Sequence, residues 1–478
     1  MNGTEIGSII GAAGLAGLLV LQDRRMRTAA FAAWAVGAAI LAGDLLHSPI
    51  ATLRVEATDR PALAVAAAAA GLAALAAGAV IAHRFPTLTL LAVVAAAPAR
   101  IPLHAGGEQA NLLVPLYGVI LAMATVSAYQ LVRGAERPPA LGPAGWALAA
   151  LAGWGGLSLL WSADTRQGGV EMLFFYLPFG FLLSRLAAMR PSMPQLRLML
   201  GVQVLLGLVF GAVAIWQHET RHLFWNHKIM VGNEYGSFFR VNSLFYDASI
   251  YGRFMAVTIV LLLGVLVYRR LTVPLVAVVA ALFAAQYLAY SQSSLLALAA
   301  GAAVLGATFW PRRLVAAMAL TVVVIGVAGL VVSSHGGSAR QVTSGRSRLV
   351  EDGWRVIRHH PLGGAGLGGF ARAALAGTAH PGRTKSAASH TTPVTVLAEL
   401  GPLGLAAYLA LAASVGWAAV RAGPDRDVRV VLAAALAAML ASSLFYNAYF
   451  EDPASWILTA LIASMSFLQP PSSREAGA

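Results

Sequence analysis

Long apolar runs alternate with short polar connections along the whole chain. The runs are about 20 residues long, which is enough for a helix to cross the roughly 30 Å hydrocarbon core of a bilayer. Backbone groups without partners are costly in lipid, so such runs predict membrane-spanning helices. About fifteen ranges fit this pattern: 7–21, 28–47, 61–83, 86–103, 111–133, 145–161, 169–188, 195–216, 250–268, 271–289, 291–309, 312–333, 392–420, 428–447 and 453–468.

The composition agrees with a membrane protein and excludes a soluble globule. Of 478 residues, 58% are hydrophobic and 11% are charged, and the mean hydropathy is +0.72. A soluble domain carries about 25% charged residues. We therefore expect an all-α polytopic membrane protein with about 12–15 transmembrane helices and a large outer, periplasmic loop that carries short helices.

Basic residues gather in the short connections that follow every second apolar run, and the formal net charge is +13. By the positive-inside rule these connections face the cytoplasm, with the N-terminus outside and the C-terminus inside a bacterial inner (plasma) membrane. The arginines form no single patch, so nucleic acid is not an expected partner, whereas membrane lipids are. The absence of cysteine excludes disulfides and thiol chemistry, and the N-terminus predicts no removable signal peptide.

The same pattern gives the organisation of the chain. Residues 1–195 read as N-terminal transmembrane helices, 196–468 as a transmembrane core, and 469–478 as a cytoplasmic tail. Two long connections of the core, 217–249 and 334–391, fall on the outer side. Long loops in compact domains commonly carry function, so candidate chemistry is sought there.

The second outer loop contains a predicted surface helix around 347–359, because Val350, Trp354, Val356 and Ile357 share one helical face. A glycine-rich segment follows it. No strand precedes that segment and it lacks the Gly-Lys-Ser/Thr of a phosphate loop, so a nucleotide site is not expected. No metal-ligand spacing occurs in the chain, and we expect no cofactor.

His390 is the most informative ionisable residue. It stands directly before Thr391, Thr392 and Pro393, which predict an N-cap and first helical turn ahead of a long apolar run. The positive end of the helix dipole favours a neutral imidazole there. A neutral imidazole is what a general base requires. A capping or interfacial histidine is the alternative.

Three further residues are candidates for the same chemistry. Glu399 lies about two and a half turns beyond His390, where a carboxyl group needs a partner; it either orients a catalytic group or orders neighbouring helices. Arg240 and Arg346 lie in the two outer loops. Arginine binds phosphate bidentately and keeps its charge, so the pair predicts an anion site, with contact to lipid headgroups as the alternative.

Other polar residues of the outer side complete the candidate set. We expect the serine turn 291–294 to serve as turn and cap, and the adjacent Glu451 and Asp452 to be solvated in a short outer turn. Four ionisable residues of the outer loops are candidates for substrate binding: Arg221, Asp247, Arg348 and His360.

Four blocks of the chain together resemble the superfamily of O-antigen ligases and polymerases, over roughly residues 196–468. In chain order they are RVNSLFYDASIY at 240–251, YSQS at 290–293, a segment from Arg346 to HPLGGAGLGGF at 360–370, and HTTPVTVLAELGPLG at 390–404. In the second block, serine stands where the family commonly has arginine, which questions a catalytic role for that turn. Residues 1–195 match only as membrane helices.

The resemblance implies metal-independent, inverting glycosyl transfer from an undecaprenyl-diphosphate-linked glycan to an acceptor hydroxyl at the outer face of the inner membrane. It implies that His390 activates the acceptor, that Arg240 and Arg346 hold the diphosphate, and that Glu399 supports the histidine or the acceptor. The acceptor is a glycolipid or a second glycan, so a polymerase is the first alternative and a protein O-oligosaccharyltransferase a variant. A transporter or flippase for lipid-linked sugars is less favoured, because its ionisable residues are expected at the midplane.

Overall fold

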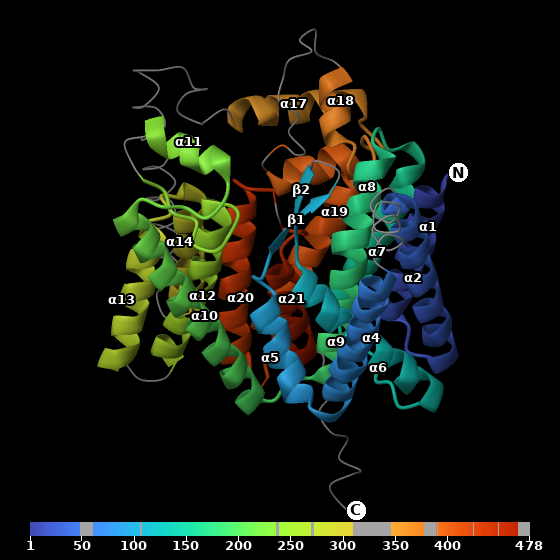
Figure 1. Ribbon diagram of the computed structural model, residues 1–478, viewed down its shortest axis with the longest axis horizontal. Helices are drawn as coiled ribbons and strands as arrows, with labels where there is room; N and C mark the ends of the chain where they lie inside the picture. Colours follow the sequence, from blue (N-terminus) through green and yellow to red (C-terminus); the bar gives the residue numbers. More distant parts are fainter. Residues whose placement is uncertain are drawn as a thin grey trace, which may run out of the picture.

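The computed structural model describes residues 1–47, 61–105, 108–235, 239–268, 272–308, 346–376, 389, 391–423, 425–447 and 449–466. Helices that run roughly parallel to one another dominate these residues (Figure 1). Within the described ranges, nine helical segments are long and apolar enough to cross a membrane, and four shorter apolar helices accompany them. The chain is a multi-pass helical membrane protein, as the sequence predicts.

The helices are α1 (Gly3–Val20), α2 (Arg24–Leu45), α4 (Pro61–Arg84), α5 (Pro86–Ala96), α6 (Val114–Arg133), α7 (Pro143–Ser158), α8 (Thr165–Glu171), α9 (Leu177–Met189), α10 (Met193–Thr220), α11 (His227–Tyr235), α12 (Ala248–Tyr268), α13 (Val273–Tyr287), α14 (Gln292–Gly306), α17 (Arg346–His359), α18 (Phe370–Ala376), α19 (Thr392–Val420), α20 (Arg426–Ser443) and α21 (Pro453–Ser466). Every expected span that falls within the described residues contains a helix. The expected span 312–333 lies outside them.

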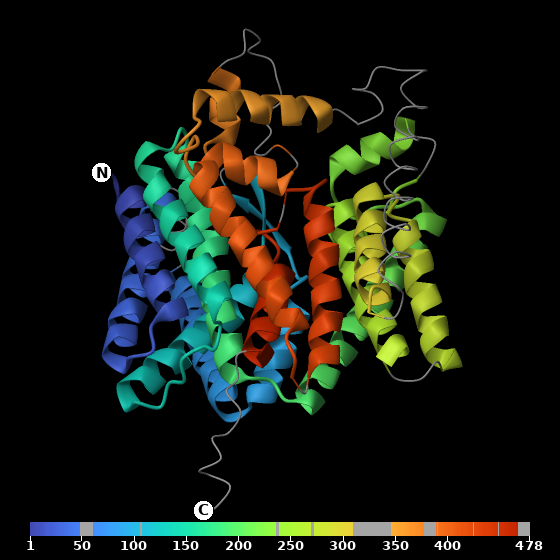
Figure 2. The ribbon, with the colours of Figure 1, turned by 180° about the vertical axis from the view of Figure 1, so that it is seen from behind.

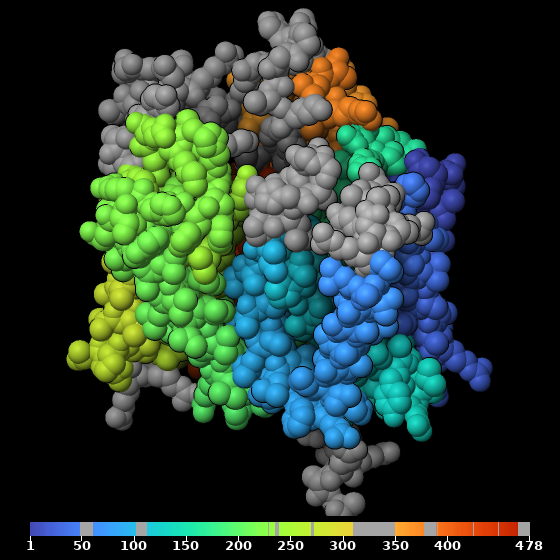
Figure 3. Space-filling view, viewed as in Figure 1, coloured from blue at the N-terminus to red at the C-terminus, as the bar shows by residue number. Residues whose placement is uncertain are grey.

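The expected span 86–103 is only partly helical. Helix α5 ends at Ala96, and the chain continues through Pro98 into an antiparallel hairpin of β1 (Ile101–Ala105) and β2 (Glu108–Leu112). Pro98 has no amide hydrogen to continue the helical hydrogen bonds, which accounts for the break. Helix α5 packs against α4, α6 and α10 and lies on the face of the molecule seen in Figure 3.

The bundle has two chemically distinct ends. One end, here called the capped end, carries α11, α17 and α18, and the N-terminus of α1 lies on the same side (Figure 1). The opposite end, here called the basic end, holds the α1–α2, α6–α7, α9–α10 and α19–α20 connections (Figures 1 and 2). Those connections are the arginine-rich ones of the sequence.

Helix α17 lies across the capped end, nearly perpendicular to the bundle (Figure 2). It matches the predicted surface helix, but one predicted member of its apolar face is wrong. Val356 is buried against Phe370 and Ala398, whereas Trp354 is 50% exposed. The face that packs on α19 therefore runs through Gly353 and Val356 instead.

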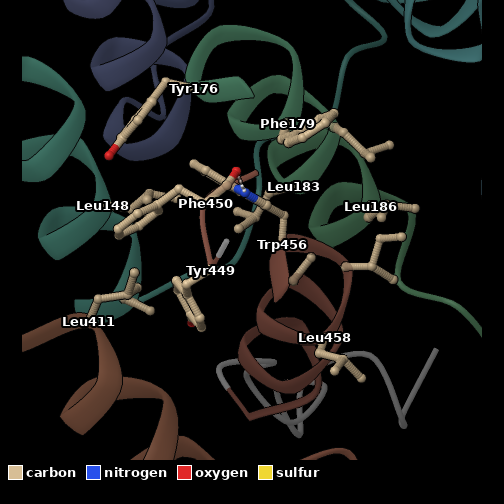
Figure 4. Packing of buried hydrophobic residues seen from close by; sticks show 14 of the residues in the cluster. Leu148, Tyr176, Phe179, Leu183, Leu186, Leu411, Tyr449, Phe450, Trp456 and Leu458 are labelled. Carbon is tan, nitrogen blue, oxygen red and sulfur yellow. Dashed lines mark hydrogen bonds between the residues drawn. The ribbon is translucent and has the colours of Figure 1, made fainter. Parts of the chain in front are cut away.

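The apolar core joins the two ranges 1–195 and 196–468. Helix α9 is buried along nearly its whole length, α7 packs on α19, and α9 packs on α21. Figure 4 shows this junction, where Tyr176 stacks on Phe450, and Phe179 and Leu183 lie close to Trp456. The N-terminal helices are thus part of the scaffold that positions the core.

A buried ion cluster closes the basic end. Glu136, in the α6–α7 connection, accepts hydrogen bonds from Arg27 Nε at 2.7 Å and from Arg185 Nη1 at 2.8 Å. Arg27 Nη1 also donates to the carbonyls of Leu18 and Leu21. The cluster is here called the basic-end triad, and it joins α2, α9 and the connection between α6 and α7.

Candidate functional site

Helix α19 is kinked where the sequence reads Glu-Leu-Gly-Pro. Gly401 has a φ of 66° and Pro402 follows it. Three carbonyl oxygens before the kink are released from the helix and find other partners. Ala398 O accepts from Ala365 N at 2.8 Å, Glu399 O from Gly366 N at 2.8 Å, and Leu400 O from Trp154 Nε1 at 2.7 Å. The kink therefore creates a docking edge for the glycine-rich loop.

The glycine-rich loop 361–369 is clasped between this edge and the α7–α8 turn. Leu367 N donates to Ser158 Oγ at 3.0 Å, and Ser162 Oγ donates to Leu367 O at 2.9 Å. Gly366 has a φ of 79°, and a Cβ there would stand 2.3 Å from Ser162 Cα. Only glycine tolerates both that conformation and that approach. The loop is a structural clasp between the two halves of the chain.

Glu399 belongs to the same clasp. Its side chain is 4% exposed, and Oε1 accepts a hydrogen bond from Phe370 N at 3.2 Å. Phe370 is the first residue of α18, where free amide groups and the helix dipole favour an anion. Glu399 therefore ties α18 to α19.

Arg240 is held at the capped end by two elements, α11 and the α13–α14 turn. Its amide N donates to Asn233 Oδ1 at 2.9 Å, and Asn233 Nδ2 donates back to Arg240 O at 3.0 Å. Its guanidinium Nε donates to Ala289 O at 3.2 Å, in the α13–α14 turn. Both Nη groups remain for a ligand, because the described residues give them no partner.

Gln217 of α10 holds the segment that follows Arg240 by hydrogen bonds to the backbone of Ser243. Its side-chain oxygen accepts from Ser243 N at 2.7 Å and its Nε2 donates to Ser243 O at 3.0 Å.

Two further candidate residues lie near this segment. Asp247 Oδ1 accepts from Ser249 N at 2.6 Å at the start of α12. Arg221 lies at the end of α10, with its guanidinium 5.0 Å from the ring centre of Phe239. The structure thus brings Arg240, Arg221 and Asp247 to one end of the bundle.

The other candidate residues are described to different extents. His390 lies outside the described residues, and the side chains of Arg346 and Arg348 do so as well, although both residues are in α17. His360 is exposed just after α17, and its backbone accepts from Gly364 N. The N-cap of α19 is Thr391, and this helix begins at the capped end (Figure 1). The proposed proximity of His390, Arg240 and Arg346 stays a prediction.

The serine turn 291–294 is occupied by local contacts. Ser291 Oγ and Ser293 Oγ are 3.1 Å apart, and Ser294 Oγ donates to Ser291 O at 2.8 Å. Ser294 also packs against Gly252 of α12, since a Cβ on that glycine would lie 2.5 Å from Ser294 Oγ. These contacts are those of the turn expected from the sequence. The expected cap is not formed, because Ser291 is the N-cap residue of α14 but its side chain makes no capping hydrogen bond.

A cavity of about 770 Å³ runs beside α12 between α5, α10, α20 and α21. It is here called the lateral groove. Lining residues of α12 extend from Ile250 to Tyr268, a rise of about 27 Å. This length approaches the roughly 30 Å of a bilayer's hydrocarbon core. Figure 3 shows the face on which α10 (green) and α5 (light blue) lie side by side over it.

The walls of the groove are mainly apolar, and its charged residues gather towards its two ends. Met199, Val257, Leu261 and Val431 are among the apolar lining. Arg197, Asp425 and Asp427 lie near the basic end, on the first turn of α10 and around the start of α20, and Arg100, Arg253 and Asp452 lie in the half nearer the capped end. Such a shape suits a molecule with a long apolar tail and a polar head.

The charged group nearer the capped end is here called the groove head. Arg253 is 1% exposed, and its Nη2 donates to Asp452 Oδ2 at 2.7 Å. Arg100 Nη2 donates to Glu451 O at 3.1 Å. Burial raises the pKa of Glu451 above its ordinary range, whereas Arg100 and Arg253 act in the opposite direction. The part of the groove head that lines the cavity consists of two arginines, Arg100 and Arg253, and one aspartate, Asp452.

The groove head corrects the sequence interpretation in one respect and extends it in another. The acidic turn was expected to be solvated, yet Asp452 pairs with a buried arginine from α12. Arg253 and Arg100 were not among the candidate residues. A signal for Arg253 was present, because it is an arginine inside the apolar run 250–268, and charges inside membrane helices are rarely without function.

Among the described residues, no group of three or more histidine and acidic side chains could hold a metal ion. The arrangement can do two things chemically. It can hold an anionic group with arginines at one end of the bundle, and it can shelter a long apolar chain beside α12. The fold defines a multi-pass membrane protein, and its groove combines mainly apolar walls with charged residues towards both ends.

The comparison with known families agrees with the resemblance seen in the sequence. Residues 276–409 match the family model described as O-antigen ligase. The matched range includes the serine turn, the glycine-rich loop and the kinked first half of α19. No curated protein matches the chain. The match confirms the resemblance to the O-antigen ligase superfamily and supports an O-antigen ligase-like function.

Proposed function

We propose that the chain transfers a glycan from an undecaprenyl-diphosphate carrier to an acceptor hydroxyl at the capped end, which faces the periplasm. The observation that carries this proposal is the lateral groove, whose apolar walls extend along α12 and end at a cationic head. The family match over 276–409 adds the reaction class. The arginine-rich connections at the basic end support the orientation.

In this proposal the apolar tail lies in the groove and the diphosphate lies near the arginines of the capped end. The acceptor oxygen attacks the anomeric carbon while its proton passes to the imidazole of His390. The bond between that carbon and the diphosphate oxygen breaks, and the leaving diphosphate departs with the lipid. Attack opposite the leaving group inverts the anomeric centre. Arg240 and Arg346 stabilise the charge that develops on the diphosphate.

Glu399 serves as a positioning residue in this mechanism. Its hydrogen bond to Phe370 N fixes α18 and the glycine-rich loop against α19, the helix that His390 precedes. The clasp therefore sets where the second outer loop can present an acceptor. This role needs no contact between Glu399 and substrate.

A polymerase and a flippase are the competing functions. A polymerase would use the same donor and a second lipid-linked glycan as acceptor, so the two are separated by supplying each acceptor to the purified protein. A flippase would move the lipid-linked glycan across vesicles without releasing diphosphate-linked lipid. Translocation without any transfer product contradicts the proposed enzyme.

The first test removes the proposed base. We expect His390→Ala to lower the transfer rate by about 10²- to 10⁴-fold, the usual contribution of general base catalysis. The measurement follows product formation with the purified protein and a lipid-diphosphate glycan. His359→Ala is the matched control, because His359 is an exposed histidine at the end of α17. Transfer at the wild-type rate by the His390 variant would exclude this role.

The second test concerns the diphosphate. We expect Arg240→Lys to be severely impaired, because lysine presents a point charge and cannot reproduce the planar fork. It also loses the Nε hydrogen bond to Ala289 O. Chelation with EDTA is expected to leave transfer unchanged. Full activity of the lysine variant would reduce Arg240 to a contact with lipid headgroups, and a metal requirement would contradict the mechanism.

A further inference from the structure

Arg253 is a buried cation whose hydrogen-bonding capacity is only partly used. It lies five residues into α12, about 8 Å from the start of that helix. Its guanidinium pairs with Asp452, and its Nε has no hydrogen-bond partner among the described residues. Its guanidinium also lies 5.7 Å from the ring centre of Tyr446. A buried donor without a partner is costly, so a ligand that accepts from it is favoured.

Asp452 holds the guanidinium in a defined place. Its Oδ2 binds Arg253, and its Oδ1 accepts from Ala454 N at 3.0 Å in the first turn of α21. The aspartate is thus anchored to a helix end, and the arginine is anchored to the aspartate. A guanidinium oriented in this way is preorganised for an anion that accepts from its remaining donors.

Arg100 brings a second positive charge to the same turn. It follows α5, is half-buried, and reaches Glu451 O, the neighbour of Asp452. Both arginines line the lateral groove, although they are far apart in the chain. Two guanidinium groups at the head of an apolar groove match a phosphate carried on a long hydrocarbon chain.

We propose that Arg253 and Arg100 form a phosphate seat inside the membrane domain, which takes the lipid-proximal phosphate of a polyprenyl diphosphate. This inference rests on the proposed function, which supplies the class of lipid. The tail then lies along α12 towards Tyr268, and the distal phosphate with its glycan points to Arg240. The seat fixes how deeply the carrier sits, so that the anomeric carbon reaches the capped end.

The seat is tested by equilibrium binding without acceptor or turnover. Native mass spectrometry of the purified chain in detergent compares undecaprenyl diphosphate, undecaprenyl monophosphate, undecaprenol, inorganic diphosphate and phosphatidylglycerol. We expect both phosphorylated polyprenols to bind about tenfold or more tightly than undecaprenol, the value of one or two charge-assisted hydrogen bonds. Equal affinity for undecaprenol, or equal affinity for phosphatidylglycerol, would overturn the assignment.

Variants locate the binding on the proposed residues. We expect Arg253→Gln to weaken binding of undecaprenyl monophosphate by about 10- to 100-fold and Arg253→Lys to weaken it less, because lysine retains the charge. Arg100→Gln is expected to weaken it several-fold and is the second variant should Arg253→Gln fail to fold. Arg166→Gln, an exposed arginine of α8, is the matched control.

The binding result and the transfer result are independent. Wild-type affinity of both the Arg253 and Arg100 variants would overturn the seat even if the protein transfers glycan. Loss of affinity in those variants would support the seat even if no acceptor is ever glycosylated. In the latter case the proposed function fails and the seat remains as a lipid-phosphate site.

Discussion

Two buried arginine clusters occupy opposite halves of the same bundle, and they differ in how completely their donors are paired. In the basic-end triad, Arg27 donates through Nε, Nη1 and Nη2 to Glu136 and to two carbonyl groups. In the groove head, Arg253 lines a cavity and has one ion pair, and its buried Nε has no hydrogen-bond partner among the described residues. The first cluster pairs its arginine donors with groups of the protein, whereas the second leaves a donor without a partner among the described residues.

This difference separates a structural role from a binding role. Removing charges from water is expensive, and only a fully hydrogen-bonded arrangement offsets that cost within the protein. The triad achieves this with its own residues and fastens three segments. In the groove head, part of the desolvation cost of Arg253 is not offset by protein groups. A bound anion would supply the missing hydrogen-bond acceptor. Burial alone therefore does not distinguish the two; the pairing of each donor does.

The largest expected effect comes from breaking the triad. We expect Glu136→Leu to lower the free energy of unfolding by about 3–5 kcal/mol, because it leaves Arg27 and Arg185 buried without their anion. Unfolding in a mixed-detergent titration, followed by tryptophan fluorescence, measures the change. Glu219→Leu is the control, since Glu219 is exposed on α10. An unchanged unfolding curve would show that the triad does not fasten the bundle.

A smaller loss is expected when one arm of the triad is removed. Arg185→Gln loses the contacts of Nη1 with Glu136 and of Nη2 with Gln130. Arg27 still neutralises the carboxylate, so we expect a loss of about 1.5–3 kcal/mol, the value of hydrogen bonds to charged groups. The same titration measures it. A loss as large as that of Glu136→Leu would mean that the two arginines act as one inseparable unit.

The smallest expected effect on stability is at the groove head. Arg253→Gln removes one ion pair whose partner, Asp452, has 16% of its side chain exposed and retains its contact with α21. Because Arg253 is buried, its removal also relieves a desolvation cost that its ion pair only partly offsets, so we expect a net change within about 1 kcal/mol. The same titration compares the loss of unfolding free energy in Arg253→Gln with that in Arg27→Gln, which we expect to be larger. A loss of several kcal/mol would make Arg253 a second structural clamp and weaken the comparison.

Much of the site could be predicted from the sequence because its signals are local. The block at 390–404 and the glycine-rich segment were both recognised, and the structure shows why they occur together. Gly401 and Pro402 release carbonyl groups, and Ala365 and Gly366 bind two of them. The pairing could not be predicted, since the residues between the two segments give no indication of which backbone groups meet.

The role of Glu399 shows the same limit. Its depth in an apolar helix predicted that it needs a partner, but both a catalytic and an ordering role remained open. The structure gives it the amide of Phe370, a contact that depends on where α18 packs. A backbone donor carries no residue-specific signal, so no inspection of side-chain types could have identified it.

The sequence by itself determined that the chain is a multi-pass membrane protein, which of its connections are basic, and which segments resemble a glycan ligase. Those properties follow from hydropathy, charge and short motifs, each confined to neighbouring residues. Only the tertiary structure decided that Arg253 meets Asp452, that Arg27 meets Glu136, and that an apolar groove opens beside α12. These pairings join residues about a hundred or more positions apart, and they exist because helix packing, not sequence proximity, decides which buried charges are left with a partner.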